Sequence, residues 1–203
     1  MGTDFKITDI VDKEQAVKIF TEAFKDDPMN ILIFDDDSTR YEMVEIIYRF
    51  VVFYVVPEMK YELKGLEVDG ELAGAVVFTT TDSLKKWSES LMGEGQKTGE
   101  RTGRRYGEMI REYYAKAIKN RPKAPHFYIN EIAVKKEFQG RGYGKALLEY
   151  AESISDSIPA STGVALDTSN PENIKLYEYL GYKLTKKFRF HGIKGYSMFK
   201  PNH

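Results

Sequence analysis

Apolar residues recur at the 3.6-residue spacing of a helix in two stretches near the start of the chain. In "DKEQAVKIFTEAF" (Asp12–Phe24) they predict an amphipathic helix, which should end before Pro28 because a residue preceding proline is disfavoured in helical geometry. In "STRYEMVEIIYRFVVFYVV", Thr39 precedes Glu42 by three residues, a capping-box pattern. We therefore expect a second helix from about Tyr41 to Val56.

The pattern then changes to that of strands. "VDGE" is a turn signal between two β-like runs at residues 62–68 and 72–80. "HFYINEIAV" (His126–Val134) and "TGVALDTS" predict further strands, and "KLTKKFRFHGIKGYSMFK" predicts a final hairpin. A helix should follow each of the two single strands: "KALLEYAESISDS" after the first, and "NPENIKLYEYLGY" after the second, with Gly181 as its C-cap signal.

A polar, helix-prone segment runs from Thr81 to Pro125, between the two groups of strands. It contains the favourable helix "EMIREYYAKAIKN" and suits no place within a sheet, so we expect a helical insertion over about residues 82–125. The order of elements predicts a mixed α/β domain with helices around a central sheet. No repeat or linker divides the 203 residues, so we expect a single domain over residues 1–203.

Composition and charge narrow the classes of function. A formal net charge of −1 gives no electrostatic footprint for nucleic acid or an anionic membrane. The absence of cysteine excludes disulfides, thiolate metal sites and a cysteine nucleophile, and it suits a reducing compartment. The three histidines are far apart in sequence, so we expect no metal site.

The most apolar run, from Met43, contains Glu45 and Arg49 and is closed by Pro57, so it is too short and too charged to span a bilayer. We expect a cytoplasmic protein.

A glycine-rich loop, "FQGRGYGK", lies between the strand ending at Val134 and the next helix. The Walker pattern fails here on spacing, and the dinucleotide pattern fails because its third glycine falls on Lys145. The pattern Q-x-x-G-x-G fits Gln139, Gly142 and Gly144. Small residues let successive backbone N–H groups approach one anion at a helix N-terminus, although a tight strand-to-helix turn alone would also need glycine.

A second constellation follows about thirty residues later, in "LDTSNPENIKLYEYLGY". Asn173 and Tyr177 are four residues apart, so they share one face of the predicted helix and could hold a ligand and donate a proton. Taken singly, Tyr177 could equally be a core tyrosine, and Asn170 a helix N-cap.

Together these motifs resemble the GNAT acetyltransferases. "INEIAVKKEFQGRGYGKALLEYAE" is similar to their fourth strand, pyrophosphate loop and following helix, and "GVALDTSNPENIKLYEYLGYKLT" to the next strand, helix and turn. Within the family, "RPKAPHFYINEIAV", "LDTSNPENIKLYEYLGY" and "GYSM" most resemble the puromycin N-acetyltransferase subgroup. The resemblance implies a GNAT fold: a central, twisted, mostly antiparallel mixed sheet flanked by helices, with the helical insertion between its third and fourth strands.

The resemblance also implies acetyl-CoA as the cofactor. The residues that match the family's cofactor-binding segments are Ile132, Ala133, Val134, Gln139, Gly140, Arg141, Gly142, Tyr143, Gly144, Lys145, Asn170, Asn173 and Tyr177.

The chemistry of amine acetylation agrees with this family. The tyrosine at position 177 matches the family's usual general acid, and a tyrosine with its reference pKa of about 10 keeps its proton at neutral pH. The backbone N–H of Val134 could polarise the thioester carbonyl. Without cysteine no acetyl-cysteine intermediate can form, so direct transfer is favoured. Glu131 and Asp167 are equal candidates for the general base.

Acceptor residues are less clear from sequence. The candidates are Phe24, Asp26, Asp27, Phe34, Trp87, Tyr106 and Tyr128. Asp26 and Asp27 could equally cap the end of the first helix, and Trp87 could pack the insertion against the core. We expect N-acetylation of a small-molecule primary amine, because the insertion should cover the site. A protein or peptide amine, and a non-catalytic acyl-CoA-binding module, are the alternatives. The family resemblance also allows a homodimer.

Overall fold

A seven-stranded sheet forms the centre of the molecule in the computed structural model, which describes residues 4–83 and 86–203. The strand order is β1-β2-β3-β4-β5-β7-β6, in which β4 and β5 are parallel and every other neighbouring pair is antiparallel. The strands are β1 (Phe5–Asp9), β2 (Glu62–Val68), β3 (Glu71–Thr79), β4 (Phe127–Val134), β5 (Gly163–Thr168), β6 (Lys183–Phe190) and β7 (Ile193–Pro201).

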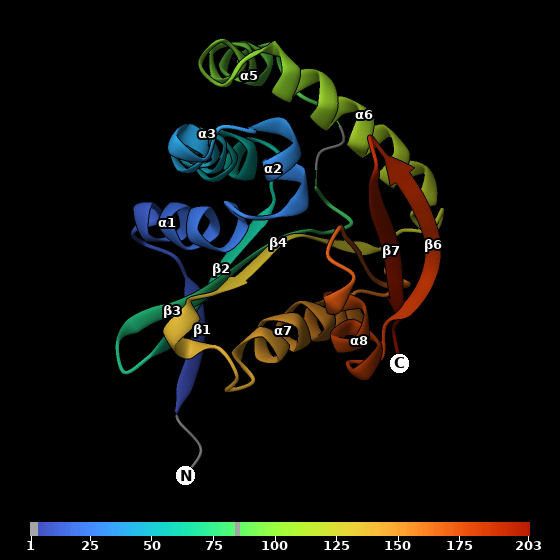
Figure 1. Ribbon diagram of the computed structural model, residues 1–203. Coiled ribbons are helices and arrows are strands. Elements are labelled where there is room, and N and C mark those ends of the chain that lie inside the picture. The colour runs from blue at the N-terminus through green and yellow to red at the C-terminus, as the bar shows by residue number, and fades with distance from the viewer. Residues whose placement is uncertain (1–3, 84–85) are drawn as a thin grey trace.

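Helices cover both faces of this sheet (Figure 1). They are α1 (Lys13–Phe24), α2 (Pro28–Ile33), α3 (Asp37–Phe50), α4 (Val56–Glu58), α5 (Glu89–Thr102), α6 (Arg104–Asn120), α7 (Tyr143–Ser157) and α8 (Glu172–Tyr179), with a π-helical turn η1 (Val51–Val55) and a 3-10 turn η2 (Lys136–Phe138). Helices α1, α2 and α3 lie on one side, and α7 and α8 on the other. Helices α5 and α6 arch from α3 to the β6–β7 hairpin.

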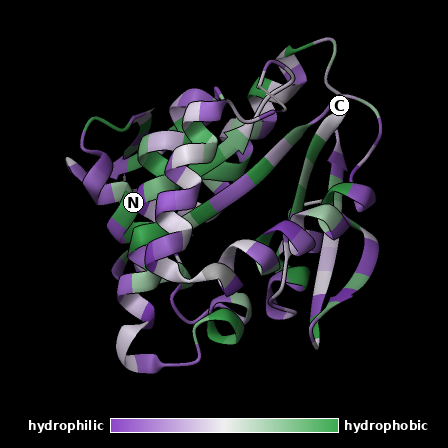
Figure 2. Ribbon diagram, turned by 90° about the horizontal axis from the view of Figure 1, so that it is seen from above, coloured by the Kyte–Doolittle hydropathy of each residue, from purple (hydrophilic) through white to green (hydrophobic). Residues whose placement is uncertain are grey.

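The alternation of side chains along β3 divides the core into two apolar clusters. Ala75 and Val77 pack with the helices of the α1–α3 side, whereas Val76 and Phe78 pack with α7. The helices alternate hydrophilic and hydrophobic residues along their length, as expected of amphipathic helices on a sheet (Figure 2). In the described part of the chain, no helix is both long and apolar enough to cross a bilayer.

The predicted fold class is confirmed, including the helical insertion between β3 and β4. Residues 84 and 85 of the predicted insertion lie outside the described residues. Helix α5 forms although it contains three glycines, because it packs on α3 and has Ser88 as its N-cap, whose hydroxyl accepts from the N–H of Leu91. Gly103, with φ of 89°, separates α5 from α6.

Three details of the helix and strand prediction were wrong. Strand β1 is missing from it, because five residues at the edge of a sheet carry little pattern. Helix α1 ends at Phe24, before Pro28 as predicted, but the prediction lacks α2, which Pro28 begins with Asp27 as its N-cap, since proline is tolerated in the first helical turn. Helix α3 begins at Asp37, capped by Asp36, rather than at the pattern around Thr39.

Candidate active site

Strands β4 and β5 separate at the centre of the sheet. They pair only over Phe127–Ile129 and Val164–Leu166, and beyond Ile129 the two strands diverge. The N–H of Lys135 donates to the carbonyl of Ala73 in β3. Because alternate residues of a strand face the same neighbour, the N–H groups of Ile132 and Val134 point into the gap that β5 leaves open.

A β-bulge at Asn130 reorients the side chains of β4. Val77 pairs with Glu131 and Phe78 pairs with Ile129, so Asn130 is the extra residue. In a regular strand Ile129 and Glu131 would share a face. Here Ile129 packs on the α7 side, whereas Glu131 points to the opposite side and accepts a hydrogen bond from the hydroxyl of Tyr48 in α3, at 3.2 Å.

Glu131 lies on the wall of a cavity of about 200 Å³, which we call the carboxylate cavity. Two further carboxylates, Asp27 at the start of α2 and Asp167 in β5, line the same cavity. Six tyrosines complete much of its wall: Tyr48, Tyr106, Tyr113, Tyr114, Tyr128 and Tyr177. The α6 insertion supplies three of them, so this helix forms one side of the cavity wall.

The three carboxylates are surrounded by neutral donors. Asp27 accepts hydrogen bonds from the backbone of Met29 at 2.8 Å and from the hydroxyl of Ser169 at 3.0 Å. Asp167 accepts one from the hydroxyl of Tyr128 at 2.8 Å. Its Oδ1 atom is buried and accepts no hydrogen bond among the described residues, although the Ser197 hydroxyl is close enough to affect its pKa.

Burial changes the ionisation of these groups. It raises the pKa of Glu131 to about 8; the Tyr48 hydrogen bond lowers this pKa and the charge of Asp27 raises it. Burial also raises the pKa of Asp27 and of Asp167 above their ordinary values, against the hydrogen bonds that lower them. A carboxyl with a pKa near 8 is suited to accept a proton at neutral to alkaline pH.

Helix α8 places Tyr177 and Asn173 on the cavity wall. Burial raises the pKa of Tyr177 to about 12, so its hydroxyl is protonated at pH 7. No described residue makes a hydrogen bond to that hydroxyl. Asn173 donates to the Thr168 hydroxyl at 3.4 Å. Asn170, also predicted to bind the cofactor, uses its Oδ1 atom to cap α8 through the N–H of Glu172.

The glycine loop leaves the start of α7 open. Gly140 and Gly142 have φ of 75° and 85°, which favour glycine, and Gly142 is an N-cap without a side-chain hydrogen bond. The first intrahelical bond runs from the N–H of Ala146 to the carbonyl of Gly142. The preceding N–H groups, from Tyr143 to Lys145, therefore have no partner in the helix and suit an anion.

Two other predicted loop residues make contacts within the protein. The Gln139 side chain donates to the carbonyl of Val134 at 2.9 Å, which ties the loop to the end of β4. The Arg141 side chain donates to the carbonyl of Glu137 at 3.1 Å. Ala133 packs in the core on the α1–α3 side, so it contributes to the site through its backbone only.

The acceptor candidates divide into two groups. Phe24, Asp27 and Tyr128 line the carboxylate cavity. Phe34 does not: it is buried and its ring stacks on Tyr106 at 5.8 Å, so it supports the wall from behind. Asp26 is likewise outside the cavity, with 72% of its side chain exposed.

Several lining residues were not identified from sequence. Tyr48 and Ser169 contact carboxylates 83 and 142 positions away along the chain, which no local pattern indicates. Of the α6 tyrosines, Tyr106 was a candidate from sequence. Tyr113 and Tyr114 could have been found too, because positions 106, 110, 113 and 114 follow helical spacing and are all apolar or aromatic.

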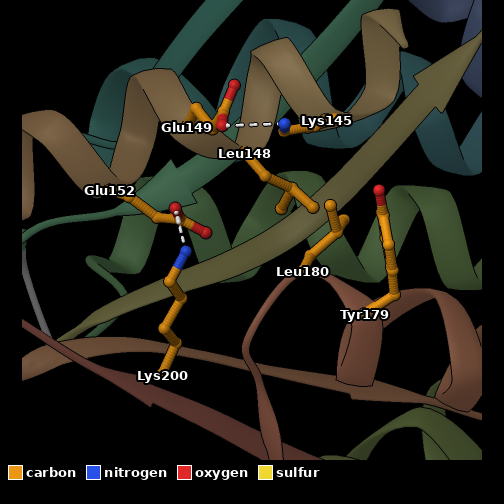
Figure 3. A pocket seen from close by; sticks show the side chains of 7 residues that line it. All are labelled: Lys145, Leu148, Glu149, Glu152, Tyr179, Leu180 and Lys200. Atoms are coloured by element: carbon orange, nitrogen blue, oxygen red, sulfur yellow. Dashed lines mark hydrogen bonds and ion pairs between the residues drawn. The ribbon is translucent and has the colours of Figure 1, made fainter.

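A second hollow, of about 320 Å³, lies elsewhere, between α7, α8 and β7 (Figure 3). Its polar side chains are paired with one another: Lys145 with Glu149 at 3.4 Å and Lys200 with Glu152 at 2.7 Å. Because its charges are already matched and it contains none of the three carboxylates, the carboxylate cavity is the candidate active site. In the described residues, no group of three or more potential ligands could hold a metal ion.

Several solved structures share this fold. One is described as histone acetyltransferase HPA2 and related acetyltransferase from Corynebacterium glutamicum, with 16% identity, a TM-score of 0.68, and coverage of 100% of this chain and 98% of that chain. PaiA N-acetyltransferase from Thermoplasma acidophilum, in complex with coenzyme A, is 14% identical with a TM-score of 0.60, over 98% and 99%. The ribosomal-protein-S18-alanine N-acetyltransferase from Escherichia coli is 16% identical with a TM-score of 0.57, over 98% and 94%.

The model of the acetyltransferase (GNAT) family matches residues 20–182, which include β4, the glycine loop, β5 and α8. The chain therefore belongs to the acetyltransferase (GNAT) family, whose enzymes transfer an acetyl group from acetyl-CoA.

Proposed function

We propose that this enzyme acetylates the primary amine of a small molecule, with Glu131 as the general base and Tyr177 as the general acid. One observation carries this proposal: a half-buried glutamate and a buried tyrosine whose hydroxyl has no hydrogen-bond partner among the described residues line the same small cavity, beside the gap between β4 and β5. The insertion helix α6 covers one side of that cavity, which favours a free amine over a protein chain.

The residues around the gap fit acetyl-CoA. The open N–H groups at the start of α7 suit its pyrophosphate, and the outward N–H groups of Ile132 and Val134 suit an extended amide chain. When bound there, acetyl-CoA supplies the acetyl group as a thioester. Asn173, on the cavity wall between Thr168 and Tyr177, would contact the arm of the cofactor near the thioester.

The protein then has three tasks. Glu131 accepts the proton of the incoming ammonium, directly or through water, so that an uncharged nitrogen forms the new C–N bond. The N–H of Val134 would donate to the acetyl oxygen. Tyr177 gives its proton to the sulfur as the C–S bond breaks. Each carboxylate accepts one tyrosine hydrogen bond, but the second oxygen of Asp167 is buried and that of Glu131 is not, so we assign the base role to Glu131.

A substrate panel tests the proposal. Purified enzyme with acetyl-CoA should release thiol in the presence of small primary amines and should not acetylate lysine-containing peptides. The Escherichia coli neighbour is named for an alanine of a ribosomal protein, so peptides with a free N-terminal alanine belong in the panel. Acetylation of peptides but not of small amines would overturn the proposed substrate class.

A further inference from the structure

The carboxylate cavity contains more negative charge than acetylation requires. Glu131 alone suffices as the base, yet Asp27 and Asp167 line the same space from α2 and β5. Among residues 4–83 and 86–203, no lysine or arginine forms an ion pair with any of the three, whereas Lys200 and Glu152, for example, pair at 2.7 Å elsewhere. The three side chains are half-buried, and desolvation raises the pKa of each, so a cationic ligand would favour their charged forms.

The wall of the cavity suits a cation independently of these charges. Aromatic faces attract ammonium groups, and six tyrosines line this space. Tyr177 is only 8% exposed, and no described residue makes a hydrogen bond to its hydroxyl. One cation outside the cavity acts on Asp167: the charge of Arg121 lowers the pKa of that carboxyl. Arg121 stacks on the Tyr128 ring at 3.3 Å and does not line the cavity.

The number of carboxylates distinguishes a monoamine from a diamine. The nitrogen that reacts must lose its charge, and its proton passes to Glu131. A monoamine would therefore leave Asp27 and Asp167 without a counter-ion at the moment of reaction. A second ammonium on the same molecule would remain protonated and provide one.

We propose that the acceptor is an aliphatic diamine or polyamine, whose second ammonium is bound by Asp27 and Asp167 while its first amine reacts at Glu131. This inference rests on the proposed function and specifies its substrate class. The charge pattern and the tyrosine wall favour this class over arylalkyl monoamines, which would leave two carboxylates unmatched.

Matched substrates test the inference. We expect kcat/KM for diaminobutane, or for the best of a series of diamines of three to eight carbons, to exceed that for the corresponding monoamine by about 30-fold or more, the effect of one buried charge pair. Asp27→Asn should reduce kcat/KM for the diamine far more than for the monoamine, so that the ratio of the two values falls from about 30 to near one. Asp26→Asn, at the exposed neighbouring position, should change neither.

Calorimetric titration provides a readout that does not depend on turnover. Diaminobutane should bind to the CoA-saturated protein more tightly than butylamine, and Asp27→Asn should remove that difference, with thermal unfolding confirming that the variant is folded. Equal kcat/KM and equal affinity for diamines and monoamines would overturn the inference while leaving the proposed function intact. Acetyl-CoA binding with no acetylation of any small amine would instead overturn the proposed function.

Discussion

Replacing Glu131 by glutamine should have opposite effects on stability and activity. Burial raises the pKa of Glu131 from 4.5 to about 8 in the folded protein, so the folded state holds a proton that the unfolded state releases. Below about pH 4.5 both states are protonated, and the carboxyl behaves like the neutral amide. Between pH 4.5 and 8 the wild type loses stability by up to about 1.4 kcal/mol for each pH unit. Above pH 8 the loss is constant.

The pKa values give the size of the effect. A difference of about 3.5 units between 4.5 and 8 corresponds to roughly 5 kcal/mol at most. Water in the cavity screens the charge, so we expect Glu131→Gln to be more stable than wild type by about 2–5 kcal/mol at pH 9 and equally stable at pH 4. For a chain of this size that is about 4–20 °C in Tm. Tyr48 can donate to the amide oxygen as it does to the carboxylate, so its hydrogen bond is retained.

The assay is thermal unfolding of both proteins from pH 4 to pH 9, with kcat/KM measured in parallel. Activity should fall by about 10²–10⁴ in the variant, as for the loss of a general base. Because the variant is more stable, this loss cannot come from misfolding. Glu108→Gln, at an exposed position of α6 with no described partner, is the control and should shift stability by less than about 0.5 kcal/mol. A Tm difference between wild type and Glu131→Gln that does not change with pH would refute the reasoning.

Three further predictions concern the same site. Tyr177→Phe should lower kcat by about 10² and leave the Kd for acetyl-CoA unchanged by calorimetry, and unchanged turnover would exclude Tyr177 as the acid. Gly142→Asp should weaken CoA binding by about 10² or more for two reasons. It adds a carboxylate where backbone N–H groups face an anion, and it places a side chain on a residue with φ of 85°, which favours glycine. A wild-type Kd for CoA would contradict the loop assignment. Tyr48→Phe removes a hydrogen bond that lowers the pKa of Glu131, so the rising limb of the pH dependence of kcat/KM should move to higher pH; an unshifted limb would show that this bond does not tune the base.

Features encoded by local patterns were predicted well from sequence. Strands β2 to β7 and helices α1, α7 and α8 follow from periodicity and turn residues, and Gly142 and Gly144 follow from motif spacing. The elements that were missed are short: β1 has five residues and α2 has six. Their formation depends on pairing with β2 and on packing, rather than on intrinsic pattern.

The chemistry of the cavity depends on contacts between distant positions. Glu131 was a candidate base from sequence, but the bulge at Asn130 decides which face it occupies, and Tyr48 decides its hydrogen bonding. The meeting of Asp27 with Ser169 likewise follows only from the folded arrangement. A single sequence contains no signal for such pairs, because each residue considered alone suits a helix cap, a strand or the core equally well.

The most direct test of the account is a single-turnover experiment with the enzyme–acetyl-CoA complex. The complex is mixed rapidly with a small primary amine, quenched, and analysed by mass spectrometry for acetylated amine and for the intact mass of the protein. Direct transfer predicts that the acetyl group appears on the amine at the rate at which acetyl-CoA is consumed, with no acetylated protein at any time, and that Glu131→Gln slows both together. An acetylated protein intermediate formed at that rate, or consumption of acetyl-CoA without acetylated amine, would contradict the account.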